Sequence, residues 1–181
     1  MAGFGWPRAA EATGKRVALF GVLFAASQIT ILSILHAGRA EHALIALQLT
    51  FDAHAFASIL TLLDAAQQRA LLQHFWLDFL HPLWYGLFAF HATALLLRRL
   101  GAAARWRWVP YLALAMAGLD LMENLVHLPL IAGWIAPTTL PVAFAATCAS
   151  LKWALAGLLT LIGCISCLRL VGYERTQRFR R

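Results

Sequence analysis

Apolar blocks separated by short polar or basic stretches dominate the pattern along the chain. A helix that crosses a bilayer needs about 20 apolar residues, because the hydrocarbon core is about 30 Å thick. Four blocks reach that length, and they cover residues 17–36, 75–97, 109–128 and 140–168. The pattern predicts an all-α integral membrane protein in which these four spans form a four-helix bundle. The fourth block is longer than the bilayer is thick, so we expect its first turns to stand outside.

The stretch between the first two blocks has a different pattern. Between residues 53 and 73, apolar residues recur at helical spacing, and polar residues share the remaining positions. Asp52 precedes this stretch and is of a residue type that caps helices. We therefore expect an additional amphipathic helix over 53–73 that lies on the outer membrane surface or covers the bundle. All of these elements belong to a single membrane domain, residues 1–181.

The first block has a second interpretation, as a cleaved signal peptide. Lys15 and Arg16 precede it, and the small residues around Arg39 form a tolerable cleavage site. The block is longer than a usual signal core, however, and it contains Gln28. We favour an uncleaved span.

Composition and charge support the membrane interpretation. The chain is 61% hydrophobic and 13% charged, whereas soluble domains are about 45–50% apolar and about 25% charged. The net charge is +7, but no basic stretch alternates with exposed aromatics, so we expect no nucleic-acid partner.

The basic residues also predict the orientation of the chain, because cytoplasmic loops are enriched in Lys and Arg. Arg39 and Arg69 would lie on one side of the membrane, and Lys152 lies within a span. We therefore expect a multi-pass protein of the cell (inner) membrane with both termini in the cytoplasm. The basic residues on the cytoplasmic side would be Arg8, Lys15, Arg16, Arg98, Arg99, Arg105, Arg107, Arg169, Arg175, Arg178, Arg180 and Arg181.

A polar stripe interrupts the third block. Asp120, Glu123, Asn124 and His127 have offsets of 0, 3, 4 and 7, which place them on one helix face. Each acid near the bilayer centre costs roughly 2.5–3.5 kcal/mol. An ion pair with Lys152 of the fourth block would offset part of that cost. Two acids and one lysine leave one negative charge over, which predicts that one acid is protonated.

A second polar stripe in the second block consists of Asp78, His81, Pro82 and Tyr85, again at offsets 0, 3, 4 and 7. Measured from the basic end of each helix at 1.5 Å per residue, the polar residues of all four spans share one depth, in the outer half of the bilayer. We predict one site there. Its candidate catalytic residues are Asp120, Glu123, Lys152 and Tyr85, and its candidate ligand-binding residues are Asp78, Asn124, Gln28, His127 and His81.

Three functions fit such a site. It could bind or modify a lipid or a small amphiphilic ligand, because acids beside Lys152 and Tyr85 can do acid–base chemistry. It could instead relay protons or ions, although the cytoplasmic halves of the spans offer few polar residues. It could also be a structural or assembly element in which polar contacts fix helix register. The sequence favours the first function and leaves open whether the protein is an enzyme and whether it forms oligomers.

The histidines raise the question of a metal or a haem. Imidazoles near carboxylates suit divalent ions, but no pair here has the spacing of a metalloprotease motif. We favour scattered interfacial residues and assign no metal, and the sequence leaves open whether the histidines bind one. No second histidine matches the depth of His91, so we expect neither haem nor another cofactor. The four outer histidines are His54, His74, His81 and His127.

Short motifs in three of the spans resemble a family of bacterial four-span membrane proteins without an assigned activity. The family pattern has an Asp followed by a Tyr seven residues later, then Asp-x-x-Glu-Asn, then a Lys. His81 stands where that pattern has an aromatic residue. The resemblance runs over residues 17–168 and implies that Asp78, Tyr85, Asp120, Glu123, Asn124 and Lys152 belong together, but it brings no reaction with it.

Overall fold

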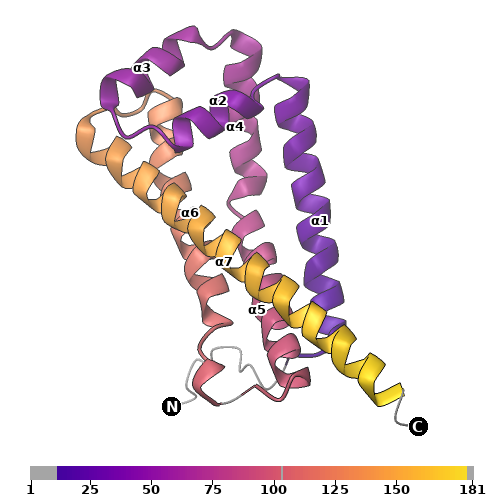
Figure 1. The fold of residues 1–181 in the computed structure, drawn as a ribbon. Helices are drawn as coiled ribbons and strands as arrows, with labels where there is room; N and C mark the ends of the chain where they lie inside the picture. The colour runs from indigo at the N-terminus through magenta and orange to yellow at the C-terminus, as the bar shows by residue number, and fades with distance from the viewer. Residues whose placement is uncertain (1–11, 103, 179–181) are drawn as a thin grey trace, which may run out of the picture.

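A computed structural model describes residues 12–102 and 104–178 (Figure 1). Helix makes up 83% of the structure, and the described residues contain no strand. The helices are α1 (Gly14–Ala37), α2 (Glu41–Gln48), α3 (Ala53–Leu62), α4 (Ala65–Asp78), α5 (His81–Arg99), α6 (Tyr111–Ile131) and α7 (Thr139–Arg178), with a short 3-10 turn, η2 (Ala104–Trp106), before α6.

Several of these helices are long and apolar enough to cross a membrane. Within the described ranges, α1, α6 and α7 each qualify, and α4 with α5 form a fourth candidate if the 49° bend between them is counted within one span. Only 6% of the apolar window of α1 and 11% of that of α7 is buried in the protein. A soluble protein would not leave such apolar helices uncovered. The structure therefore fits the prediction of a multi-pass, all-helical membrane protein.

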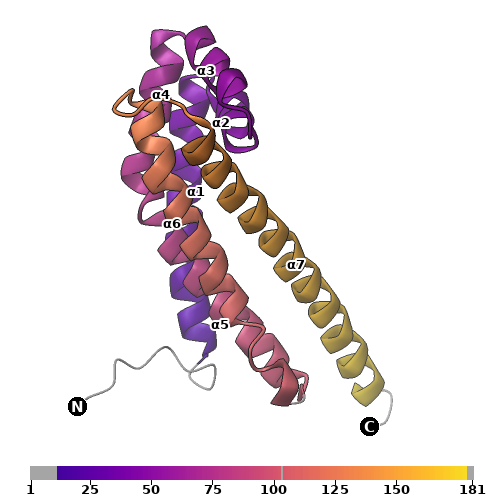
Figure 2. The same ribbon diagram turned by 90° about the vertical axis from the view of Figure 1, so that its left-hand side faces the viewer.

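The long helices run between the same two ends of the molecule in alternating senses, and the short helices α2 and α3 gather at one of these ends. In Figure 1, α2 and α3 lie at the end where α1 finishes and α7 begins, while α5 ends and α6 begins at the opposite end. α6 packs most extensively on α7 and α5, and α1 packs on α5 and α4. Figure 2 shows α7 diverging from α1 and α5 toward its own C-terminal end. At 40 residues, α7 is roughly 60 Å long, about twice the hydrocarbon thickness.

The predicted helix over 53–73 begins as expected but is not continuous. Asp52 caps α3, since its Oδ1 accepts a hydrogen bond from the backbone N–H of Ala55 at 2.7 Å. The prediction of one helix is wrong because α3 ends at Leu62 and Leu63 is extended.

A second cap starts the next helix at once. Asp64 accepts hydrogen bonds from the backbone N–H groups of Ala66 and Gln67, and the Gln67 side chain accepts from the Asp64 N–H. This capping box is a strong helix start. α4 then continues past residue 73 and the expected start of the second span, and it ends at Asp78.

The break between α4 and α5 is explained by a proline near the start of α5. In a continuous helix the N–H of residue 82 would donate to the carbonyl of Asp78, but Pro82 has no N–H. The side-chain amide of Asn124 on α6 donates to that carbonyl instead, at 3.0 Å. Both residues are buried, so this bond replaces the one that the proline removes. The polar stripe of α6 therefore supports the bend that carries Asp78.

Small residues bring the helices close together. A Cβ at Gly86 of α5 would lie 2.8 Å from the Cβ of Ala117 on α6, and one at Gly38 would lie 2.3 Å from the Cβ of Ala70 on α4. Such approaches are typical of packing between membrane helices.

We expect Asn124→Leu to lower the free energy of unfolding by about 1–3 kcal/mol, because the buried Asp78 carbonyl then has no donor. In a Pro82→Ala background, residue 82 regains an N–H, and the same substitution should cost clearly less. Unfolding of the four proteins of this double-mutant cycle in detergent, followed by circular dichroism, measures the difference. An additive cycle would contradict the exchange of donors.

Candidate functional site

A buried lysine between two acids forms the centre of the site. The Nζ of Lys152 on α7 lies 2.5 Å from Oδ1 of Asp120 and 2.7 Å from Oε2 of Glu123. Asp120 and Glu123 are three residues apart on the same face of α6, and all three side chains are buried. The ion triad joins α6 to α7 and offsets the desolvation of each charge.

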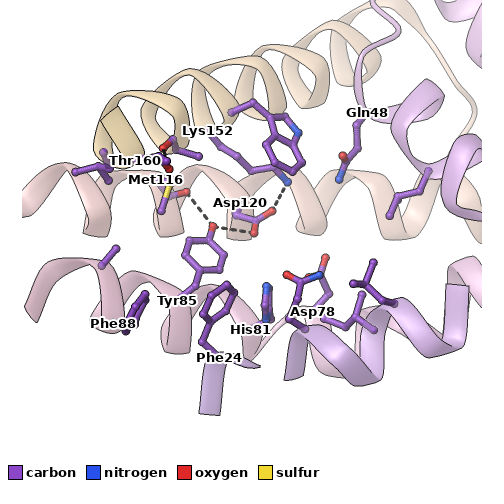
Figure 3. Close-up of a pocket in the computed structure, with 18 of the residues that line it drawn as sticks. Phe24, Gln48, Asp78, His81, Tyr85, Phe88, Met116, Asp120, Lys152 and Thr160 are labelled. Atoms are coloured by element: carbon purple, nitrogen blue, oxygen red, sulfur yellow. Dashed lines mark hydrogen bonds and ion pairs between the residues drawn. The ribbon is translucent and has the colours of Figure 1, made fainter. Parts of the chain in front are cut away.

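A third helix, α5, contacts the ion triad through Tyr85. The hydroxyl of Tyr85 donates a hydrogen bond to Oδ2 of Asp120 at 2.8 Å and lies 3.5 Å from the carbonyl oxygen of Met116. The carboxylate of Asp120 therefore receives a tyrosine hydroxyl from α5 on one oxygen and the ammonium of Lys152 on the other (Figure 3).

On the side toward α3, the triad contacts a histidine through Glu123. Nδ1 of His127 lies 3.3 Å from Oε1 of Glu123, and its ring stacks on Phe56 of α3 with centroids 5.8 Å apart. The protonated acid expected from the sequence stays a prediction.

A cavity of about 530 Å³ opens beside the triad, between α1, α5 and α7 with α2 at one end. Asp120, Lys152 and Tyr85 face it, as does the bend between α4 and α5. Its two ends differ in character. The end toward α2 carries the polar side chains among apolar residues of α1 and α2 such as Leu35 and Leu44, whereas the opposite end is mainly apolar. The polar residues, which define what we call the polar end, are Gln28, Glu41, Gln48, His74, Asp78 and His81, and the apolar end is lined by Phe88, Ala92, Leu96, Leu159, Thr160 and Gly163.

The polar end of the cavity is partly charged. Hydrogen bonds from its own backbone and from the ring of His36 hold the pKa of Glu41 below its ordinary value. Glu41 is therefore ionised at neutral pH where α2 covers the cavity. Figure 3 shows Asp78 and His81 beside each other on one wall, with Lys152 and Gln48 across from them.

Most of the predicted site residues come together, but in two layers. Gln28, Asp78, His81, Tyr85, Asp120 and Lys152 line the cavity. Glu123, Asn124 and His127 lie behind it, where Glu123 contacts Lys152, Asn124 contacts the α4 end and His127 contacts Glu123. The roles assigned to all of these residues stay predictions.

The sequence interpretation left out of the site three cavity residues that carry an acid, an amide or an imidazole group. His74 was considered only as an interfacial histidine, and Glu41 and Gln48 lie in α2, which was not predicted. His74 carried a usable signal, because His74, Asp78, His81 and Tyr85 continue one stripe at offsets 0, 4, 7 and 11. Glu41 and Gln48 carried none, since the position of α2 depends on the turn that follows α1.

The histidines do not gather around one point. Within residues 12–102 and 104–178, no group of three or more His, Cys, Asp or Glu side chains has the geometry to hold a metal ion. His54 is exposed on α3, whereas His127 is buried against Phe56.

No protein-family model, no curated protein and no solved structure matches this sequence. The case for a function therefore rests on the geometry of the site.

We expect Lys152→Met to lower the free energy of unfolding by about 3–5 kcal/mol, because it leaves two acids buried together without a cation. Leu151→Met is the matched control, since Leu151 is 50% exposed on the outer face of α7. Combining Lys152→Met with Asp120→Asn and Glu123→Gln should restore most of the loss. Thermal unfolding in detergent measures all of these proteins, and a Lys152→Met protein as stable as the control would contradict the role of the triad.

Proposed function

We propose that the protein binds a lipid or a small amphiphilic ligand in the cavity beside Lys152, in the outer half of the bacterial inner membrane. In this proposal the four apolar segments form a four-helix bundle, with α4 and α5 together as the second span. α2 and α3 cover its outer side as short interfacial helices. Both termini face the cytoplasm, as the distribution of Lys and Arg predicts.

The observation that carries the proposal is the change in character along one cavity. The charged and amide side chains lie toward α2, and the lining becomes apolar along α5 and α7. From Lys152 to Gly163 this wall is roughly 16 Å long, about half the thickness of the hydrocarbon core. A polar head at one end and an acyl chain along the other would match both its chemistry and its length.

The arrangement of α1 and α7 supports entry from the bilayer. Both helices line the cavity, yet α7 packs mainly on α6 and diverges from α1 and α5 (Figure 2). The outer faces of both helices carry exposed apolar residues, such as Val22 and Leu161. A ligand dissolved in the membrane could therefore reach the cavity sideways, without crossing a polar surface.

The two other functions have less support. A proton relay needs a continuous polar path, but toward the cytoplasmic end the polar lining residues are Thr93 and Thr160 among apolar side chains. A purely structural role explains the ion triad, which joins α6 to α7. It does not explain a cavity next to the triad, because well-packed helices would fill that space.

Gly163→Trp should reduce or abolish the co-purification of a bound amphiphile, because the new ring would occupy the apolar end of the cavity. A Cβ at Gly163 meets no atom within 4 Å, so the helix itself can accommodate the change. Native mass spectrometry and lipid analysis of gently purified protein measure the bound species.

Gly157→Trp is the matched control for this experiment. Gly157 is an exposed residue of α7 with equally open surroundings, and it does not line the cavity. The proposal requires that Gly157→Trp keeps the ligand and Gly163→Trp loses it. Equal lipid content in both variants and in the wild type would exclude the cavity as the binding site.

A further inference from the structure

The polar wall of the cavity carries a buried hydrogen-bond acceptor that lacks a donor. His74 is 1% exposed and lines the cavity, and its Nδ1 contacts the carbonyl oxygen of Leu71. A carbonyl only accepts, so Nδ1 carries the hydrogen and Nε2 of the neutral ring is an acceptor. Among the described residues this Nε2 has no hydrogen-bond partner, and it lies 3.8 Å from Oδ2 of Asp78, a second acceptor.

His81 lies on the same wall. Its Nδ1 lies 2.8 Å from the hydroxyl oxygen of Ser27, which also lies 2.9 Å from the carbonyl oxygen of Phe24. The ring of neutral His81 has one N–H and one lone pair, so it adds a polar group to this wall in either tautomer.

The strong donors near this wall are already engaged. The ammonium of Lys152 contacts Asp120 and Glu123, and the hydroxyl of Tyr85 donates to Asp120. In the part of the chain that the structure describes, His74 is the only basic side chain that lies within 4 Å of the Asp78 carboxylate, and its Nε2 lies 3.8 Å from Oδ2. The wall therefore offers the Asp78 carboxylate and the lone pair of His74 Nε2, and the ammonium of Lys152 across from this wall is already paired with Asp120 and Glu123.

Aromatic rings surround the same space. Phe24, Tyr85, Phe88 and Trp153 line the cavity, and the Nζ of Lys152 already lies 5.7 Å from the ring centroid of Trp153. Aromatic faces attract cations, and the attraction is stronger where water is excluded.

We infer that the ligand carries an ammonium head group, which binds between Asp78 and His74 with its apolar tail along α5 and α7. An ammonium supplies three N–H donors and one positive charge, which is what this wall lacks. The inference rests on the proposed function and specifies its ligand. The ammonium could belong to a membrane phospholipid with an ethanolamine head or to a free long-chain amine.

Three probes with the same tail test the head group: dodecylamine, dodecanoate and dodecanol. Native mass spectrometry of delipidated protein in maltoside detergent gives the occupancy at each concentration. We expect protonated dodecylamine to bind at least about tenfold more tightly than the other two, because its hydrogen bonds are charge-assisted. Equal binding of dodecanoate or dodecanol would overturn the inference.

Asp78→Asn removes the charge while keeping the shape of the side chain. It should weaken dodecylamine binding by about tenfold or more and leave dodecanol binding unchanged. Asp52→Asn is the matched control, because Asp52 is an exposed acid outside the cavity and asparagine caps a helix as well. Unchanged dodecylamine affinity in Asp78→Asn would overturn the inference, because the ammonium would then not bind at the Asp78 carboxylate.

Two phospholipids with identical acyl chains separate the possible sources. Preference for phosphatidylethanolamine over phosphatidylglycerol would support a membrane lipid as the ligand, whereas preference confined to dodecylamine would support a free amine. If dodecanol binds as well as dodecylamine and Gly163→Trp blocks both, the ammonium inference fails and the proposed function stands. If none of these probes or lipids binds, both fail.

Discussion

The burial of one lysine between two acids is the constraint on which the rest of the structure depends. Lys152, Asp120 and Glu123 can leave water only together, because an unpaired charge in hydrocarbon costs several kcal/mol. Their contacts fix the rotation and the depth of α7 against α6. The second oxygen of Asp120 then fixes Tyr85 and with it α5. Three helices are thus held by charge and hydrogen bonds at a point where apolar packing alone would allow them to slide.

The polar stripe of α6 distributes its residues among different neighbours. Asp120 and Glu123 pair with Lys152 of α7, Asn124 donates a hydrogen bond at the break between α4 and α5, and His127 packs on α3. Each of these polar residues therefore contacts a specific neighbouring element. Asp78 lies at this break and lines the cavity. Asn124 lowers the energetic cost of the break, because its amide replaces the N–H donor that proline removes.

The sequence was sufficient for the apolar segments and for an ion pair of Lys152 with Asp120 or Glu123, because periodicity and charge balance leave few alternatives. It was insufficient where local chemistry interrupts a smooth pattern. The capping box at Asp64 divides a stretch whose hydrophobic periodicity continues, and hydropathy does not register it. The cavity could not be predicted either. It depends on the direction of α7, which is apolar around most of its surface and so has no stripe that reveals its orientation.

A cavity of this kind has different energetics in a membrane than in a soluble protein. In water, an apolar void loses dispersion contacts that nothing replaces. Beside a bilayer, lipid tails are as apolar as leucine and can fill the space between α1 and α7 at little cost. In the proposed function, the apolar end of the cavity would therefore discriminate weakly among tails. Selectivity would come from the other end, where buried acceptors gain most from a ligand that brings donors and charge. For that reason we expect the side chains of His74 and Asp78, more than the volume of the cavity, to determine which amphiphile binds.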